Sequence, residues 1–259
     1  MMRQLVVTVA PHEAELASDA LWGLGVVAVE ERNVTDGIEL WTSLGDADTV
    51  DLPWPWRFVE VDEAVADTWR QYATPIWVED DLVVRPSWVA FEAADGVTVL
   101  SIEPGATFGM GDHPTTRLTL AAARRNVTAG CSVLDVGCGS GVLAIGAMVF
   151  GAGAAVGIDI APAAVPVTEA NALANGVHVD VSTTPLEELE GAFDIVLANI
   201  LAPALVALAP HLRRVLAPGG TLVVSGILEH SHSHVLHALE PLHAVRTDTL
   251  DGWAAVTLR

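Results

Sequence analysis

Apolar and polar residues alternate with two different periods along this chain. From residue 117 onward, short β-branched runs such as 132–137 (SVLDVG) are separated by longer stretches with helical spacing, such as 142–152 (VLAIGAMVFGA). The other predicted strands and helices of this region lie at 117–127, 154–160, 161–176, 177–182, 193–200, 203–220, 221–227 and 232–242. This alternation predicts an α/β fold with a doubly wound parallel sheet.

Both ends of the chain depart from this alternation. Two β-rich runs at 244–250 and 253–258 flank an Asp-Gly pair, which predicts a closing antiparallel hairpin. The N-terminal part has a predicted helix at 12–25 and predicted strands at 3–10, 26–31, 37–43, 57–61, 81–89 and 96–105. The order of its first sixty residues indicates a small α+β unit of the ferredoxin-like kind, although 44–56 leaves little room for a second helix.

The tryptophans support a division of the chain into domains. Seven of the eight lie before residue 90, and only Trp253 lies after it. We predict an α+β domain over 1–62, a linker helix and connecting segment over 63–90, and an α/β domain over 91–259. The linker helix is expected at 62–74.

Composition narrows the classes of partner. Apolar residues make up 51% of the chain, the net charge is −21, and all twelve cationic residues are arginines. A strongly acidic surface repels nucleic acid and anionic lipid, and it attracts a basic protein or a cationic small molecule. We therefore expect no direct nucleic-acid partner and no membrane.

Two further features bear on localisation. The cysteines Cys131 and Cys138 lack the C-x-x-C spacing, and the N-terminal residues lack a secretory leader pattern, so a cytoplasmic location is expected. Residues 137–158 carry no charge and are long enough to suggest a transmembrane helix. Glycines interrupt them, however, at 137, 139, 141, 151 and 153, and Asp135 and Asp159 bracket them, which favours a buried helix between two parallel strands.

The clearest motif is VLDVGCGSG at 133–141, where a strand leads through three glycines directly into a helix. Glycines at these points let the backbone approach a ligand, and the start of the helix offers free N–H groups. Asp159 follows the next strand, 22 residues after Gly137. An acid in this place can accept hydrogen bonds from both hydroxyls of a ribose.

Two cofactors compete for this motif. A nicotinamide cofactor favours G-x-G-x-x-G, whereas position 142 is Val142, and its pyrophosphate would be repelled by the carboxylate of Asp135. The same carboxylate suits a cofactor with an ammonium group, and S-adenosylmethionine has an ammonium, a ribose and a sulfonium. The residues favour S-adenosylmethionine without excluding the nicotinamide.

Other polar residues have weaker signals. Asn199 ends the strand DIVLAN, where it could hold an adenosine group or an amine, or serve as a helix N-cap. His113 could act as a base or ligand, or form a hydrogen bond that stabilises its loop. The histidines at 230, 232, 234 and 237 suggest a metal at first, but no Cys or acid completes a ligand shell, so no metal is predicted.

Several motifs together resemble one family. In chain order they are PGATFGMGDHPTT, VLDVGCGSGVLAIGA, GIDIAPAAV, ANILAPAL and LAPGGTLVVSGIL, which span roughly 100–230. These motifs are similar to those of the PrmA-type methyltransferases, which modify protein eleven of the large ribosomal subunit. The glycine motif alone is common to many methyltransferases, but its combination with FGMGDHPTT and NILA is specific. One departure is Met110, where the family commonly has Thr.

The resemblance implies a Rossmann-like class I methyltransferase sheet behind a substrate-recognition domain. It also implies that FGMGDHPTT packs over the methyl donor. The predicted cofactor-binding residues are Phe108, Thr116, Asp135, Gly137, Gly139, Asp159 and Asn199. Asn199 is the one predicted catalytic residue, as an orienter of the incoming amine.

The resulting hypothesis is a monomeric, S-adenosylmethionine-dependent protein N-methyltransferase. Its expected substrate is a basic ribosomal protein, protein eleven of the large subunit, methylated on lysine side chains, on the N-terminal amine or on both. The alternatives are a methyltransferase of the same branch that acts on another protein's lysines, a nicotinamide-dependent oxidoreductase and a non-catalytic binding module.

Overall fold

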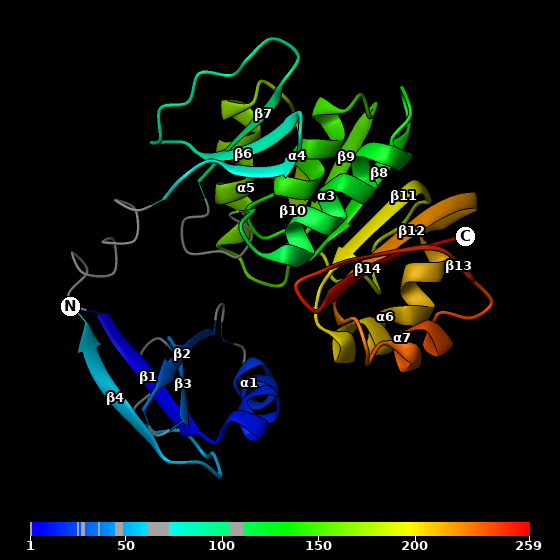
Figure 1. Ribbon diagram of the computed structural model, residues 1–259. Coiled ribbons are helices and arrows are strands. Elements are labelled where there is room, and N and C mark those ends of the chain that lie inside the picture. Colours follow the sequence, from blue (N-terminus) through cyan, green and yellow to red (C-terminus); the bar gives the residue numbers. More distant parts are fainter. Residues whose placement is uncertain are drawn as a thin grey trace. The chain divides into compact units, whose positions relative to one another are not determined.

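The computed structural model of the protein describes residues 2–259 except 25, 27–28, 36, 45–48, 62–72 and 104–110. The chain forms two compact units, Met1–Ala73 and Thr74–Arg259 (Figure 1). The division between them lies inside 63–90, the predicted connection. The predicted linker helix falls almost entirely outside the described residues.

In its described residues, the smaller unit is a four-stranded antiparallel sheet with one α-helix. Its elements are β1 (Met2–Val9), the 3-10 helix η1 (Pro11–Glu13), α1 (Ala14–Gly23), β2 (Glu30–Val34), β3 (Gly37–Thr42) and β4 (Trp56–Val61). The strand order β2-β3-β1-β4 is that of a ferredoxin-like sheet, as the sequence predicts. The strand expected at 26–31 instead lies at Glu30–Val34.

A loop packs where a ferredoxin-like unit would have its second helix. The described residues between β3 and β4 form no helix. Instead Val50, Leu52 and Trp54 pack against the core that β1, β3 and α1 share. The indole Nε1 of Trp54 also donates a hydrogen bond to Glu13 Oε1 at 3.3 Å. The short connection therefore closes the core with apolar loop residues.

The larger unit contains a seven-stranded sheet of order β10-β9-β8-β11-β12-β14-β13. Its strands are β8 (Ser132–Val136), β9 (Ala154–Ile158), β10 (Asp180–Ser182), β11 (Phe193–Asn199), β12 (Leu216–Leu228), β13 (Ala244–Leu250) and β14 (Trp253–Leu258). The first five are parallel, and β14 pairs antiparallel with both β12 and β13. This mostly parallel arrangement is the predicted Rossmann-like sheet with its antiparallel closing hairpin.

Helices cover both faces of this sheet. They are α3 (Pro114–Asn126), α4 (Val142–Val149), α5 (Ala164–Ala174), α6 (Ala202–Arg214) and α7 (Ser233–Ala238). Successive residues of a strand point to opposite faces, so Val133 of β8 packs in one core cluster with α3, α4 and α5. Its neighbour Leu134 packs in the other cluster with α6 and α7. Because both faces of these strands pack against helices, apolar residues point to both faces and the strands show no simple alternation of apolar and polar residues.

The helix predicted at 203–220 ends earlier than expected, at Arg214. The next residues already belong to β12, because the N–H of Phe193 bonds the carbonyl of Val215 and Leu216 pairs with Phe193. Pro218 has no N–H, and Gly219 has a φ of 78°, so neither residue continues the helix. The hairpin turn behaves as predicted, with positive φ at both Asp251 and Gly252.

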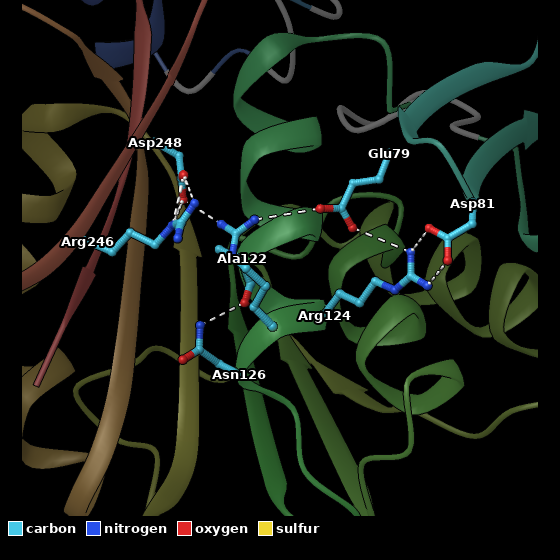
Figure 2. A network of polar contacts seen from close by, with 8 residues as sticks. Glu79, Asp81, Ala122, Arg124, Asn126, Arg246 and Asp248 are labelled. Atoms are coloured by element: carbon cyan, nitrogen blue, oxygen red, sulfur yellow. Dashed lines mark hydrogen bonds and ion pairs between the residues drawn. The ribbon is translucent and has the colours of Figure 1, made fainter.

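A second, three-stranded sheet belongs to the larger unit. It consists of β5 (Ile76–Glu79), β6 (Leu82–Pro86) and β7 (Thr98–Ile102), with β6 and β7 parallel. An ion-pair network connects it to α3 and β13, as Figure 2 shows, through Arg124–Asp81 at 2.5 Å, Arg125–Glu79 at 3.7 Å, Arg125–Asp248 at 2.5 Å and Arg246–Asp248 at 2.8 Å. Every cation in this network is an arginine.

The uncharged stretch 137–158 is divided among a glycine loop, the eight-residue α4 and β9. Among the described residues, no helix is long and apolar enough to cross a membrane.

Candidate functional site

The glycine loop joins β8 to α4 at the carboxyl end of the sheet. Gly137, Gly139 and Gly141 have φ values of 74°, 54° and 80°, which side chains rarely tolerate. A Cβ on Gly137 would lie 2.5 Å from Ile200 Cγ2, and one on Gly141 would lie 2.6 Å from Thr168 Cγ2. The loop therefore needs glycine both for its backbone conformation and for space.

Asp159 lies beside this loop, at the end of β9. Its Oδ2 accepts a hydrogen bond from Gly139 N and its Oδ1 accepts one from Ala161 N, both at 2.8 Å. The side chain is half-buried. A carboxylate has about four acceptor positions, so two backbone bonds leave positions for further donors. The predicted ribose-binding residue is thus also a support of the glycine loop.

Asp135 is fully buried near the end of β8. Its Oδ2 accepts a hydrogen bond from Ala144 N at 3.1 Å, in the first turn of α4, while its Oδ1 has no hydrogen-bond partner. Burial, with a smaller contribution from the nearby charge of Asp159, raises the pKa of Asp135 to about 7, against the opposing effect of the Ala144 N–H bond. A cation beside Oδ1 would satisfy this oxygen and favour its ionised form.

Thr116 and Asn199 meet at the same edge of the sheet although 83 residues separate them. Asn199 ends β11, and its Nδ2 donates to Thr116 Oγ1 at 3.5 Å. Thr116 is fully buried in the first turn of α3. The fold therefore brings together one residue from the FGMGDHPTT motif and one from the NILA motif.

His113 has a structural role in this region. It is the N-cap of α3, and its Nδ1 contacts Thr115 Oγ1 at 2.8 Å and accepts a hydrogen bond from Thr115 N at 3.4 Å. Its ring meets that of Trp253 edge-to-face, with centroids 5.0 Å apart. Burial lowers its pKa despite the neighbouring Asp112. Of the roles considered for His113, a hydrogen bond that stabilises its loop agrees with these contacts.

One predicted cofactor contact, Phe108, lies outside the described residues, and so does the variant position Met110. The histidines at 230–237 make local contacts instead of a cluster: His232 Nδ1 lies 2.9 Å from Leu228 O, and His237 Nδ1 lies 3.1 Å from Glu240 Oε1. In the part of the chain that the structure describes, no three His, Cys, Asp or Glu residues are arranged to hold a metal.

Sequence reasoning missed Ile160. This side chain directly follows Asp159 and is 91% exposed, so it offers an apolar surface next to the glycine loop. The signal available in GIDIAP is a β-branched residue that directly follows an acid at the end of a strand, whereas the predicted strand at 154–160 includes Ile160.

Comparison with known proteins identifies the family. The family model for ribosomal protein L11 methyltransferases (PrmA) matches residues 57–259. The chain belongs to this family. The match covers the glycine loop, Asp159, Asn199 and the three-stranded sheet, whereas most of the smaller unit precedes it.

Individual relatives agree with the family model. The chain is 47% identical over 175 residues to a ribosomal protein L11 methyltransferase of Geobacter metallireducens, covering 68% of this chain and 58% of that protein. It is 41% identical over 203 residues to one of Pelotomaculum thermopropionicum, covering 76% of this chain and 66% of that protein. The chain thus spans less than two thirds of the length of these relatives.

A solved structure is also similar. The crystal structure of ribosomal protein L11 methylase from Lactobacillus delbrueckii subsp. bulgaricus superposes with a TM-score of 0.67 at 29% identity, covering 71% of this chain and 97% of that chain. The predicted family and fold class are therefore confirmed.

Proposed function

We propose that the protein is an S-adenosylmethionine-dependent N-methyltransferase whose substrate is ribosomal protein L11. One observation carries the proposal: a fully buried carboxylate, Asp135, keeps one oxygen without a partner beside a glycine loop. A buried unpaired acceptor is costly in a protein interior. A ligand with an ammonium group would complete this site, whereas a pyrophosphate would be repelled.

The residues around the loop suit the remaining groups of S-adenosylmethionine. Asp159 has acceptor positions for the ribose hydroxyls, and the exposed side chain of Ile160 would cover one face of the adenine. The positive φ values and missing Cβ atoms of the loop glycines allow close approach to the backbone. Thr116 and Asn199 would border the donor on the side of α3 and β11.

When bound, S-adenosylmethionine supplies a methyl group that is already activated by its sulfonium. The protein is then required mainly to position the acceptor and exclude water. Because Asn199 donates through Nδ2 to Thr116, its Oδ1 is the atom left to accept a hydrogen bond from an incoming amine. We propose that Asn199 orients the lysine or N-terminal amine in this way. The lone pair of the amine nitrogen would then point at the methyl carbon.

The smaller unit is proposed to recognise the protein substrate. Residues 1–73 contain fourteen acidic residues and four arginines, so the unit is strongly negative. A basic ribosomal protein would be attracted to such a surface. Lysines of another protein remain the second candidate substrate, because the same acidic surface would attract them.

The test is to incubate the protein with isotopically labelled S-adenosylmethionine and a mixture of ribosomal proteins, followed by mass spectrometry. We expect label on lysine or N-terminal amines of L11. Asn199→Ala should abolish labelling even at donor concentrations that saturate the variant, and Asn126→Ala, a change of the same kind at the far end of α3, should not. A thermal shift with NAD but not with S-adenosylhomocysteine would reject the proposal.

A further inference from the structure

Helix α5 has a polar face buried against the donor site. Thr168, Asn171 and Asn175 are three and four residues apart, so they lie on one face of the helix and its C-cap. Thr168 is 0% and Asn171 is 3% exposed. Each polar atom of a buried Asn or Thr side chain needs a hydrogen-bond partner, so the partners show which parts of the fold these side chains connect.

Each asparagine side-chain amide pairs with the N–H and the C=O of one residue at the end of β7, as a neighbouring strand would. Asn175 Oδ1 accepts from Ser101 N at 2.8 Å and its Nδ2 donates to Ser101 O at 2.7 Å. Asn171 makes the same pair of bonds to Glu103, at 2.9 Å and 2.8 Å. Ser101 and Glu103 are two residues apart, so their N–H and C=O groups point to the same side of β7. The side-chain amides thus satisfy the edge that β7 does not present to β6.

The third hydrogen bond distinguishes the two asparagines. Asn171 Nδ2 also donates to Ser140 O, in the glycine loop, at 2.9 Å. Asn175 Nδ2 instead donates to Asn171 O, within its own helix, at 2.7 Å. Thr168 adds a second contact to the loop, because its Oγ1 donates to Gly139 O at 3.1 Å. Of the two asparagines, Asn171 is the one whose amide bonds both to Glu103, which directly follows β7, and to the glycine loop.

We propose that Asn171 is a positioning residue of the methyl-donor site, which rests on the proposed function. One amide group, buried and with both N–H groups used, fixes Ser140 relative to Glu103. Ser140 lies between Gly139 and Gly141, so its carbonyl sets the path of the loop backbone that would face the donor. Glu103 is the residue at which the chain leaves β7 towards the FGMGDHPTT motif. Thr168 supports the same loop from the preceding turn of α5.

The asparagine pair provides a matched test. Asn175→Ala removes a pair of bonds to Ser101 of β7 and Asn171→Ala a pair to Glu103, which directly follows β7, so both should lower the melting temperature. Only Asn171→Ala removes the bond to the glycine loop. We expect it to weaken binding of S-adenosylhomocysteine, measured by calorimetry, by about five- to tenfold, and Asn175→Ala to stay within about twofold of the wild type. With saturating donor, kcat of Asn171→Ala should stay within about twofold, so the change appears in the donor KM.

A second variant guards against misfolding. Thr168→Val is nearly isosteric, touches the glycine loop and leaves both asparagines in place, so it should weaken donor binding by about two- to fivefold without loss of fold. Equal donor affinities for the two asparagine variants, or an unchanged affinity in Thr168→Val, would overturn the inference while the proposed function stands. No binding of S-adenosylhomocysteine by the wild type would overturn the proposed function itself.

Discussion

The two units of the protein handle their polar groups in opposite ways. Of the described residues, the smaller unit buries a single polar side chain, Thr42. The larger unit buries eleven, most of them near the glycine loop, α3 or the hairpin: Ser101, Thr115, Thr116, Thr119, Asp135, Ser140, Thr168, Asn171, Thr221, Ser225 and Thr257. Buried polar groups are held in one geometry by their hydrogen bonds, which suits a site that must fix a small ligand.

In the smaller unit the polar groups instead form a ladder on one face of the sheet. Arg32 pairs with Glu30 at 2.8 Å and lies 4.0 Å over the ring of Trp41. Glu39 accepts bonds from Trp41 at 3.0 Å and from Arg57 at 2.7 Å. Arg32, Glu30 and Arg57 are about half exposed, so these contacts are available to a partner. The difference is consistent with the proposal that the larger unit positions the donor and the smaller unit recognises the protein substrate.

The strongest test of this separation removes the smaller unit. A protein that begins at Thr74 should bind S-adenosylhomocysteine within about twofold of the full chain, because every donor contact proposed lies in 74–259. Methylation of L11 should fall by about a hundredfold or more, as when the central part of an interface is lost. Calorimetry and a labelled-methyl assay measure the two effects. Full activity of the shortened protein would assign another role to the smaller unit.

The next largest effect should come from Asp159→Ala. The change removes the acceptors proposed for the ribose and a support of Gly139, so donor binding should weaken by about 1.5 to 3 kcal/mol, the range for charge-assisted hydrogen bonds. Asp180→Ala on the adjacent strand is the control, since that exposed carboxylate bonds only to His178 in the described contacts. Equal affinities in both folded variants would remove Asp159 from the site.

A pH series should give a smaller, about fivefold effect. The pKa of Asp135 is raised to about 7, so the group is mostly neutral at about pH 6 and mostly ionised at about pH 7.5. If the ionised form binds the donor ammonium, apparent affinity should rise with pH over this range in proportion to the ionised fraction. An α-amino group has a pKa of about 7.7 to 8.0, so it is still more than half protonated at about pH 7.5 and reduces the rise only in part.

The control for this series is Asp135→Asn, which cannot ionise and should give a nearly flat pH profile. The stability of the ligand-free protein should change with pH in the opposite direction. Because the pKa of Asp135 is raised in the folded state, the unfolded state loses this proton at a lower pH than the folded state does. The free energy of unfolding should therefore fall as pH rises from about 4 to 7. Parallel pH profiles in the wild type and Asp135→Asn would show that another group controls donor binding.

The smallest effect expected is that of salt. The acidic surface should speed encounter with a basic protein, and salt screens this attraction over a Debye length of about 8 Å at physiological ionic strength. Raising salt from about 50 to 300 mM should lower kcat/KM for L11 a few-fold and leave donor affinity nearly unchanged. Circular dichroism checks that the fold is intact. A flat profile would indicate that the acidity serves solubility.

The sequence predicted the larger unit well because its elements have strong local signals. The Asp251-Gly252 turn and the three glycines of the loop each require a backbone conformation that few other residues adopt. The helix at 203–220 was predicted too long, because the pairing of Leu216 with Phe193 depends on a distant strand. Local propensity does not contain that information.

Contacts between distant side chains could not be read from the sequence. Asp159 was correctly placed at the end of a strand, but its bond to Gly139 N depends on how β8 and β9 pair. The amide contacts of Asn171 and Asn175 join residues 68 and 74 positions apart. In the sequence, these asparagines are part of an ordinary helix ending in Asn-Gly.

The network of Figure 2 uses arginine for every cation, and this choice has a chemical consequence for an enzyme of the proposed type. Bidentate pairs such as Arg124 with Asp81 need the planar guanidinium, and lysine would not replace it in the same geometry. The chain as a whole contains no lysine. An enzyme that methylates lysine amines would therefore carry no side-chain acceptor of its own. Neighbouring copies could not consume the donor by methylating each other's side chains, even at high enzyme concentration.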